Sequence, residues 1–363
     1  MHIKSKLAAA VMAASMAGQV SAVELGEFNG TSFSIGGYVK AEGMFTQPDD
    51  GDNSFEGSVR QSRLNFAAKR DIEGHKVIGF IEGDFWNNNT EEESSYALRL
   101  RHAYINVDNL TIGQTWNGQF LASAPVDVGA INFFGAGNGT FAGSGSEIRP
   151  DLVMHYTLGG ARFTLQDPYY DDADFPDLVA AYTWRTEGGH IFNVAMSGRE
   201  VYTGVYTGED DSDYGVALAA GAKFKFGNTD VSINGFSGKG AAAYTSWGYN
   251  GAKGPATSDV NAEGELITVT GFSAGVAHQF TDKLKGIVRY GQVTADEFDA
   301  AVAFTDDDTL KSTNVSLIYS YLPQLDLGIE WRDLNAATRP PTSASSSLRP
   351  AGTQVELMAM YKF

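Results

Sequence analysis

The most constraining feature of this 363-residue sequence is a regular alternation between very short and long connections. Apolar and polar residues alternate with a period of two in about sixteen stretches, which predicts β-strands. The predicted strands span 31–46, 60–69, 76–86, 96–107, 109–115, 152–158, 160–167, 178–186, 190–199, 214–226, 228–236, 265–280, 283–293, 310–321, 324–332 and 352–363. Even-numbered connections are tight, for example "DN", "GG" and "GN", whereas odd-numbered ones are long and mostly polar. Membrane-spanning barrels sort their loops in this way, whereas a soluble β-sandwich has no reason to do so.

We therefore expect an all-β fold, a transmembrane antiparallel β-barrel of about 16 strands with long outer loops and short periplasmic turns. No amphipathic helix or domain linker is recognisable, so residues 23–363 should form one barrel domain. The alternation runs to the end of the chain, where Val355, Leu357, Ala359, Tyr361 and Phe363 occupy every second position. Closure would pair this last strand with the first strand as well, and its end would then not fray.

Residues 1–22 have the features of a secretory signal peptide. Lys4 and Lys6 precede the short apolar run "LAAAVMAASMAG", and Val20 and Ala22 occupy the −3 and −1 positions of a cleavage site. The run is too short for a membrane-spanning helix, which needs about 20 apolar residues. An exported chain that crosses a membrane by strands is expected in the bacterial outer membrane.

Charge and cysteine content exclude several functional classes. The net charge is −18, and removing the two leader lysines leaves 26 − 2 = 24 basic against 44 acidic residues, or about −20. Nucleic acid is not an expected partner, because phosphate binding needs a basic surface. The chain contains no cysteine. This excludes disulfides, iron–sulfur clusters, cysteine-ligated zinc and thiol nucleophiles.

The acidic residues are concentrated in the long loops. The runs are Asp49–Asp52, Glu91–Glu93, Asp171–Asp174, Glu209–Asp213, Asp296–Asp299 and Asp306–Asp308. They are either solvated loop tips or sites where loose divalent cations bridge the protein to anionic lipid and lipopolysaccharide headgroups. None has EF-hand spacing, and we predict no resident cofactor or metal site.

A series of arginines is assigned to the lumen, because arginine on the lipid face would cost ~2–4 kcal/mol at the membrane midplane. The predicted pore-lining residues are Arg63, Arg99, Arg101, Arg162, Arg185, Arg289 and Arg332. Glu82 and Asp84 are also predicted to line the pore, on the strand that lies between the strand of Arg63 and the strand of Arg99 and Arg101. Two hypotheses remain open. The favoured one is a basic ladder that guides anions; in the other, the arginines pair with neighbouring carboxylates and stiffen the wall.

The connection from 116 to 150 differs from the other long loops. It is apolar and rich in glycine, and Asp127, Glu147 and Arg149 are its only charged residues. An exposed loop would not present residues such as Ile131 and Phe133 to water. We predict a constriction loop that folds inward and narrows a channel that would otherwise be wide. The alternative is a lid or subunit-contact loop above the barrel.

Sequence motifs give no support for an enzyme. "GFSAG" (271–275) matches a nucleophile elbow, but Ser273 lies in mid-strand and not on a strand–turn–helix bend. "GAGNGTFAG" resembles a phosphate loop, but no helix or suitably placed lysine follows it. The six histidines show no metal-ligand spacing, and His102 and His155 are expected to be wall residues.

Four short motifs resemble the DcaP-like family of bacterial outer-membrane porins. They are "VRQSRLNF" (59–66), "LRLRHAYINV" (98–107), "LTIGQTW" (110–116) and the terminal "MYKF". The resemblance is strongest over about 35–165. It implies a trimer of sixteen-stranded barrels, a constricting third outer loop and a preference for small anionic solutes such as carboxylates. The motifs align the lumen arginines of the family with Arg63, Arg99 and Arg101, so the resemblance implies the same role for these three residues. Some members have a coiled coil after the signal peptide, whereas here only "VELGEFNG" precedes the first predicted strand.

The expected function is that of a trimeric outer-membrane porin, a water-filled channel for passive diffusion of small hydrophilic solutes, with a preference for anions. Two rivals are an outer-membrane hydrolase that uses Ser273 and a surface adhesin with a plugged lumen. The terminal Phe363 also resembles the signal read by the barrel-assembly machinery, a further expected partner. Its deletion should therefore impair insertion more than conductance.

Overall fold

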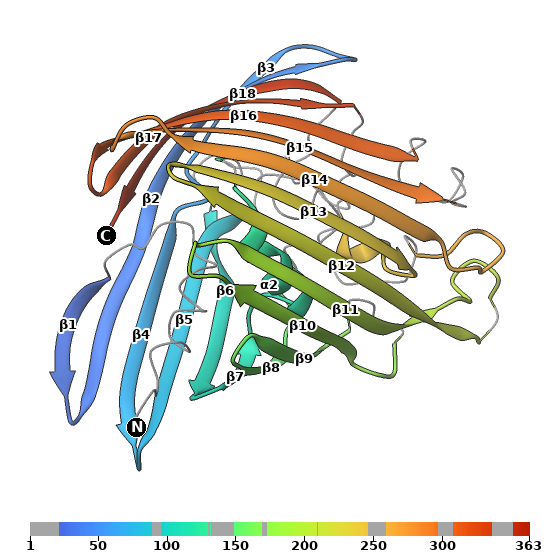
Figure 1. Ribbon diagram of the computed structural model, residues 1–363, viewed down its shortest axis with the longest axis horizontal. Coiled ribbons are helices and arrows are strands. Elements are labelled where there is room, and N and C mark those ends of the chain that lie inside the picture. Colours follow the sequence, from blue (N-terminus) through green and yellow to red (C-terminus); the bar gives the residue numbers. More distant parts are fainter. Residues whose placement is uncertain are drawn as a thin grey trace.

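One antiparallel sheet curves round and closes on itself in the computed structural model (Figure 1). The structure describes residues 22–88, 96–129, 131, 149–168, 173–208, 210–245, 259–296, 308–335 and 351–363. The sheet has eighteen strands, two of which, β1 and β3, pair only with β2. The other 18 − 2 = 16 strands form the ring, which confirms the predicted sixteen-stranded barrel.

The ring strands coincide with the predicted ones to within a few residues. They are β2 (Thr31–Pro48), β4 (Arg63–Ile72), β5 (His75–Asn88), β6 (Tyr96–Val107), β7 (Leu110–Gln114), β8 (Val153–Leu158), β9 (Ala161–Gln166), β10 (Asp177–Arg185), β11 (Ile191–Tyr202), β12 (Ser212–Phe226), β13 (Thr229–Lys239), β14 (Thr268–Gln279), β15 (Leu284–Asp296), β16 (Thr309–Leu322), β17 (Leu325–Leu334) and β18 (Gly352–Lys362). Helical structure in the described part of the chain comprises α2 (Gly118–Ser123), η1 (Ala124–Val126) and η3 (Ala242–Tyr244).

Two short strands correct the sequence prediction. β1 (Val23–Phe28) lies in a segment expected to precede the first strand, and β3 (Ser54–Ser58) lies in an expected long polar loop. The cause is the length of β2. β18 pairs with its residues 38–48 and β4 with its residues 31–38, so each partner leaves part of one edge open. β1 and β3 cover these two open edges.

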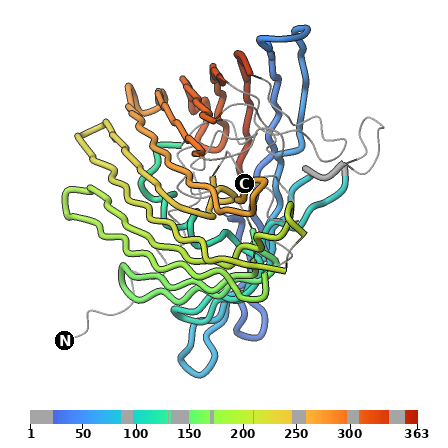
Figure 2. The backbone as a smooth tube through the Cα atoms, turned by 90° about the vertical axis from the view of Figure 1, so that its right-hand side faces the viewer, coloured from blue at the N-terminus to red at the C-terminus, as the bar shows by residue number. Residues whose placement is uncertain are grey.

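Tight turns gather at one end of the barrel, as the connection lengths predicted. Glu73 and Gly74, which join β4 to β5, have φ values of 54° and 86°. Positive φ at both central residues is the type I′ geometry that matches strand twist. Figure 2 shows the β1–β2 and β4–β5 hairpins reaching beyond their neighbours at one end, and the β2–β3 hairpin reaching beyond the others at the opposite end.

The two faces of the wall alternate in chemistry along each strand. On β18, Leu357 is 54% exposed on the outside, whereas the adjacent Glu356 on the inside is 1% exposed. Large apolar side chains cover the outer face on the other strands too, and Tyr182, Trp184, Tyr319, Tyr321 and Tyr361 are exposed near strand ends. Apolar outside and polar inside is the pattern of a barrel in lipid.

The seam of the barrel includes the last residue of the chain. The Phe363 amide donates to the Gly37 carbonyl at 3.2 Å, and the Gly37 amide donates back to Phe363 at 3.1 Å. Gly37 has a φ of 151° and lies close to the Arg63 backbone of β4, so a side chain could not fit there. The alternation that runs to the C-terminus therefore belongs to the closing strand.

Deletion of Phe363 should destabilise the barrel more than the substitution Phe363→Ala. The deletion removes both seam hydrogen bonds, worth about 1 kcal/mol each, whereas alanine keeps them. Thermal unfolding in detergent, followed by the electrophoretic shift between folded and unfolded barrel, measures the difference. Equal melting temperatures for the two variants would show that these bonds do not hold the seam.

Candidate functional site

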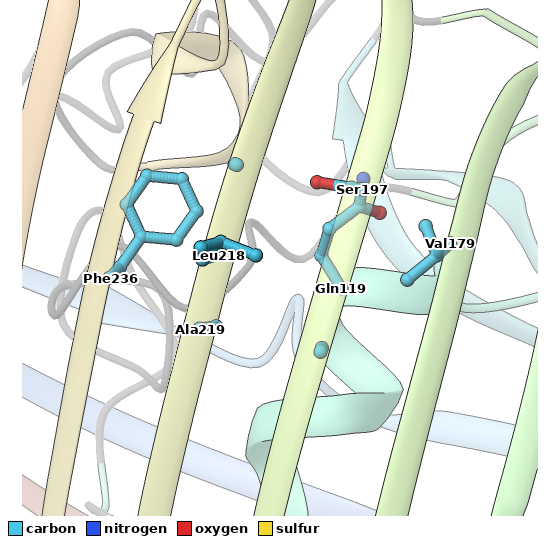
Figure 3. Close-up of a pocket in the computed structure, with 8 residues that line it drawn as sticks. Gln119, Val179, Ser197, Leu218, Ala219 and Phe236 are labelled. Atoms are coloured by element: carbon cyan, nitrogen blue, oxygen red, sulfur yellow. The ribbon is translucent and has the colours of Figure 1, made fainter.

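A segment of the 116–150 connection runs along the inner wall of the barrel. Asn117 caps α2 by accepting a hydrogen bond from the Phe120 amide at 2.8 Å. The Gly118 amide donates to Gln166 of β9 at 2.9 Å. Figure 3 shows Gln119 of α2 beside the wall, between Val179 of β10 and Phe236 of β13. The connection thus enters the lumen directly after β7.

Polar side chains of the wall hold the loop backbone at successive points. Arg162 of β9 donates to the Leu121 carbonyl at 3.1 Å, and Asn193 of β11 donates to the Ala122 carbonyl. Further along, Lys223 of β12 donates to the Asp127 carbonyl at 3.1 Å. The Asp127 carboxylate pairs with Arg289 of β15 at 3.1 Å.

At the far end of the described loop segment, the backbone of Ile131 is hydrogen-bonded to two wall residues. Its amide donates to Glu330 of β17 at 2.8 Å, and its carbonyl accepts from Lys40 of β2 at 3.2 Å. Residues 117–129 and 131 therefore lie along the inner face from β9 to β17 and β2. This inward path confirms the predicted constriction loop over its described residues; Glu147 lies outside them.

Glycines on the wall make room for three apolar side chains of the loop. A Cβ on Gly221 of β12 would lie 2.7 Å from Val126, and one on Gly328 of β17 would lie 2.7 Å from Ile131. A Cβ on Gly275 of β14 would overlap Val128, which packs with Ala277 and Ile287. Each glycine forms a notch for one loop side chain, so the segment has one defined position along the wall.

The predicted arginine cluster of β4 to β6 lies on the inner wall and is bound to carboxylates. Arg99 makes a bidentate pair with Asp84 at 2.9 and 2.7 Å. Arg101 bonds to Asp84 at 2.7 Å and to Glu82 at 3.0 Å, and Arg63 lies 3.7 Å from Glu82. Asp84 is 2% exposed. These contacts favour the wall-stiffening hypothesis for the cluster over the ladder hypothesis.

The remaining predicted residues have other surroundings. Arg332 of β17 donates to Gln354 at 3.1 Å and is buried. Arg149 stacks over the Trp116 ring at 4.7 Å, which ties the return of the connection to its start. Arg185 is exposed at the end of β10 next to a tight turn. Ser273 of β14 is 3% exposed, on the same inward face as Gly275.

Sequence reasoning missed the residues that anchor the loops. Lys40 is fully buried and pairs with Glu42 and, at 3.4 Å, with Glu356. The alternation of β2 places Lys40 on the lumen face, and this is the signal in the sequence for its role. His102 and His155 bond to Thr115 and Thr164, and His155 also contacts the Trp116 carbonyl at 3.0 Å.

A second connection also turns inward, contrary to its expected place as a polar outer loop. Tyr244, directly after β13, is fully buried and donates to Asp177 of β10. Asp259 pairs with Arg199 of β11 at 3.3 Å. Gln166 donates to both Tyr244 and Gln119, at 3.0 and 3.2 Å, which links this connection to α2.

Within the described ranges, no three histidine or acidic residues are grouped so that they could hold a metal ion. Of the acidic outer runs, Glu91–Glu93 lies outside those ranges and four others lie only partly within them, so the suggestion of bridging divalent cations stays a prediction. No helix in the described part of the chain is long and apolar enough to span a membrane.

Comparison with known proteins supports the architecture. No protein-family model matches the chain. Outer membrane protein U of Vibrio parahaemolyticus (serotype O3:K6, strain RIMD 2210633) is 26% identical over 313 residues, covering 79% of this chain and 88% of that protein. The crystal structure of the channel DcaP of Acinetobacter baumannii matches with a TM-score of 0.71 at 20% identity, covering 93% of this chain and 99% of that one. The protein is an outer-membrane β-barrel with the porin fold.

The fold that the resemblance to DcaP-like porins implies is thereby confirmed. An anion-selective porin from Comamonas acidovorans also matches, with a TM-score of 0.63 and 14% identity over 92% of this chain and all of that one. At such identities a structural match establishes the fold, and any solute must be argued from the lumen of this barrel.

Substitution of Gly275 by alanine should move the constriction loop, because the added methyl overlaps Val128. We expect altered single-channel conductance in Gly275→Ala and recovery in the double variant Gly275→Ala/Val128→Ala. Gly235→Ala on the adjacent β13 is the matched control, because its Cβ would have nothing closer than 4.0 Å. Failure of Val128→Ala to restore the conductance would rule out the notch.

Loss of the buried acid in the arginine cluster should be costly. Asp84→Asn leaves Arg99 and Arg101 without their shared carboxylate, which should destabilise the barrel by about 3 kcal/mol. Glu56→Gln is the control, because the Glu56–Arg60 pair is more exposed and such pairs contribute at most about 1 kcal/mol. Urea unfolding in lipid vesicles compares the two, and equal losses would show that the cluster does not stiffen the wall.

Proposed function

We propose that this porin is a passive, non-enzymatic channel for small hydrophilic solutes, with a preference for anions such as carboxylates. The main support is the path of the constriction loop. Its residues 117–129 and 131 are hydrogen-bonded to the inner wall at both ends and at points in between. A loop held in this way narrows the lumen while its backbone bonds stay satisfied by the wall.

The chemistry of the inner wall supports a hydrophilic solute. Buried side chains on this face are predominantly polar or charged, for example Asn193, Ser232, Asn234, Ser312 and Asn314. An apolar solute would gain little there and would leave these groups without water. The anion preference has weaker support: it draws on the inward arginines and lysines and on the likeness to an anion-selective porin.

We further propose that three copies associate in the membrane, as the resemblance implies. One of the matching structures, OmpT of Vibrio cholerae, is described in a trimer form. The lipid and lipopolysaccharide contacts of the rim, and recognition of Phe363 by the barrel-assembly machinery, belong to the same proposal. The aromatic side chains near the strand ends are suited to the lipid–water interface.

The hydrolase alternative has little support from the described lumen. Ser273 neighbours Asn234 and Gly291 across the sheet, and its strand places it inside, away from lipid. A plugged adhesin predicts a distinct outcome in the same experiment.

Reconstitution into planar bilayers tests the proposed function. Under a KCl gradient we expect stepwise conductance and a reversal potential of the sign given by chloride preference. Cross-linking of the purified protein in mild detergent measures the number of copies. Folded protein that never conducts would favour the adhesin, and a clear cation preference would refute the anion bias.

A further inference from the structure

Two groups of inner-wall cations differ in the kind of partner they have. In the first group each cation lies within 4 Å of a carboxylate. Its described members are Lys40, Arg63, Arg99, Arg101, Arg199, Lys225, Arg289 and Lys362. Charges paired in this way attract a passing solute weakly, because the carboxylate cancels most of their field.

A second group has no carboxylate at ion-pair distance among the described residues. It consists of Arg162 on β9, Arg185 on β10, Lys223 on β12 and Lys285 on β15. Arg162 and Lys223 bond to loop carbonyls, at Leu121 and Asp127. A carbonyl satisfies a donor but does not neutralise its charge. We call these four residues the basic mouth cluster.

Strand register places all four near the same end of the barrel. Arg162 is the second residue after the β8–β9 turn, and Arg185 is the last residue of β10 before the next tight turn. Lys223 lies four residues before the β12–β13 turn at Gly227, and Lys285 is the second residue of β15. Arg185 and Lys223 are also at the same level of the sheet, because each is the cross-strand partner of Ile191 on β11, which lies between them.

Three of the four side-chain charges, those of Lys223, Arg185 and Lys285, are close enough to act on one another. Lys223 interacts electrostatically with Arg185 and Lys285. The acids in range are Asp230, already paired with Lys225 at 3.2 Å, and Asp127, already paired with Arg289 at 3.1 Å. Like charges held together in this way create a positive potential that an incoming anion would relieve.

We propose that the basic mouth cluster is a binding site for small oxyanions, carboxylate or phosphate, on the short-turn side of the constriction loop. A guanidinium can hold such a group by two parallel hydrogen bonds, and the lysines add point charges. The site deepens the proposed function and rests on it. It also moves the solute contact from the predicted Arg63, Arg99 and Arg101 to the opposite group of strands.

The loop gives the site its position in the pathway. Because Arg162 and Lys223 bond to the loop backbone and lie near the short-turn ends of their strands, an anion leaving the constriction on that side would meet the cluster next. Conduction requires binding that is strong enough to admit the anion and weak enough to release it. Amine and guanidinium groups in partial contact with water suit that requirement better than a fully buried pair.

The test compares three forms of the full-length porin in planar bilayers: the natural protein, Lys223→Gln/Lys285→Gln and the control Lys283→Gln. Lys283 carries the same charge two residues from Lys285 but is exposed in the β14–β15 turn. The double variant should lower the chloride-to-potassium permeability ratio by at least about threefold, and the control should leave it unchanged. Phosphate added at millimolar concentration should reduce the chloride current of the natural protein and of the control only.

Retained selectivity and retained phosphate inhibition in the double variant would overturn the site. If the natural protein does not conduct, the proposed function fails, and the site is then judged by calorimetric titration of inorganic phosphate into the detergent-solubilised protein. Binding that disappears in the double variant and persists in Lys283→Gln supports the cluster. Equal binding, or none in any form, refutes it.

Discussion

Backbone hydrogen bonding in a medium without water is the constraint on which the rest of this structure depends. Each unpaired amide or carbonyl in the hydrocarbon core costs several kcal/mol, so a sheet can cross only if it has no open edge. The ring meets this requirement at the seam between β18 and β2, down to the bonds between Gly37 and Phe363. The same requirement explains β1 and β3, which cover the parts of the long β2 that its ring partners do not reach.

The closed wall then acts as a template for the constriction loop. A sixteen-stranded ring leaves a lumen that side chains alone do not fill, so a loop can enter it only if the wall supplies its hydrogen bonds. The wall does so with side chains from β9, β11, β12, β17 and β2, while Gly221, Gly275 and Gly328 allow close approach. Polar contacts fix the backbone, and the three notches fix its position along the wall.

Period-two alternation was sufficient to predict the ring strands, their faces outside the register shift in β6, and the inward path of the described part of the 116–150 connection, because each is a local property of the chain. The partners of the lumen charges were not local. Between β5 and β6 the register shifts at Glu82/Gly83, so Arg101 comes beside Glu82 although simple alternation does not specify that pair. The glycine notches were equally invisible, since a glycine becomes a notch only when another segment reaches it. Likewise β1 was too short to stand out, and its role depends on the length of β2.

Charge in a barrel wall has to be judged pair by pair. The net charge of the chain comes largely from acidic outer loops, and an arginine count along the inner face treats bound and unbound cations alike. Arg99 and Arg101 share Asp84, so their contribution to the field in the lumen is small, and their main effect is to cross-link two strands. Lys223, by contrast, bonds to a carbonyl, which carries no opposing formal charge. Selectivity should therefore follow the cations whose partners are neutral, and in this barrel these lie on the strands between which the constriction loop is anchored.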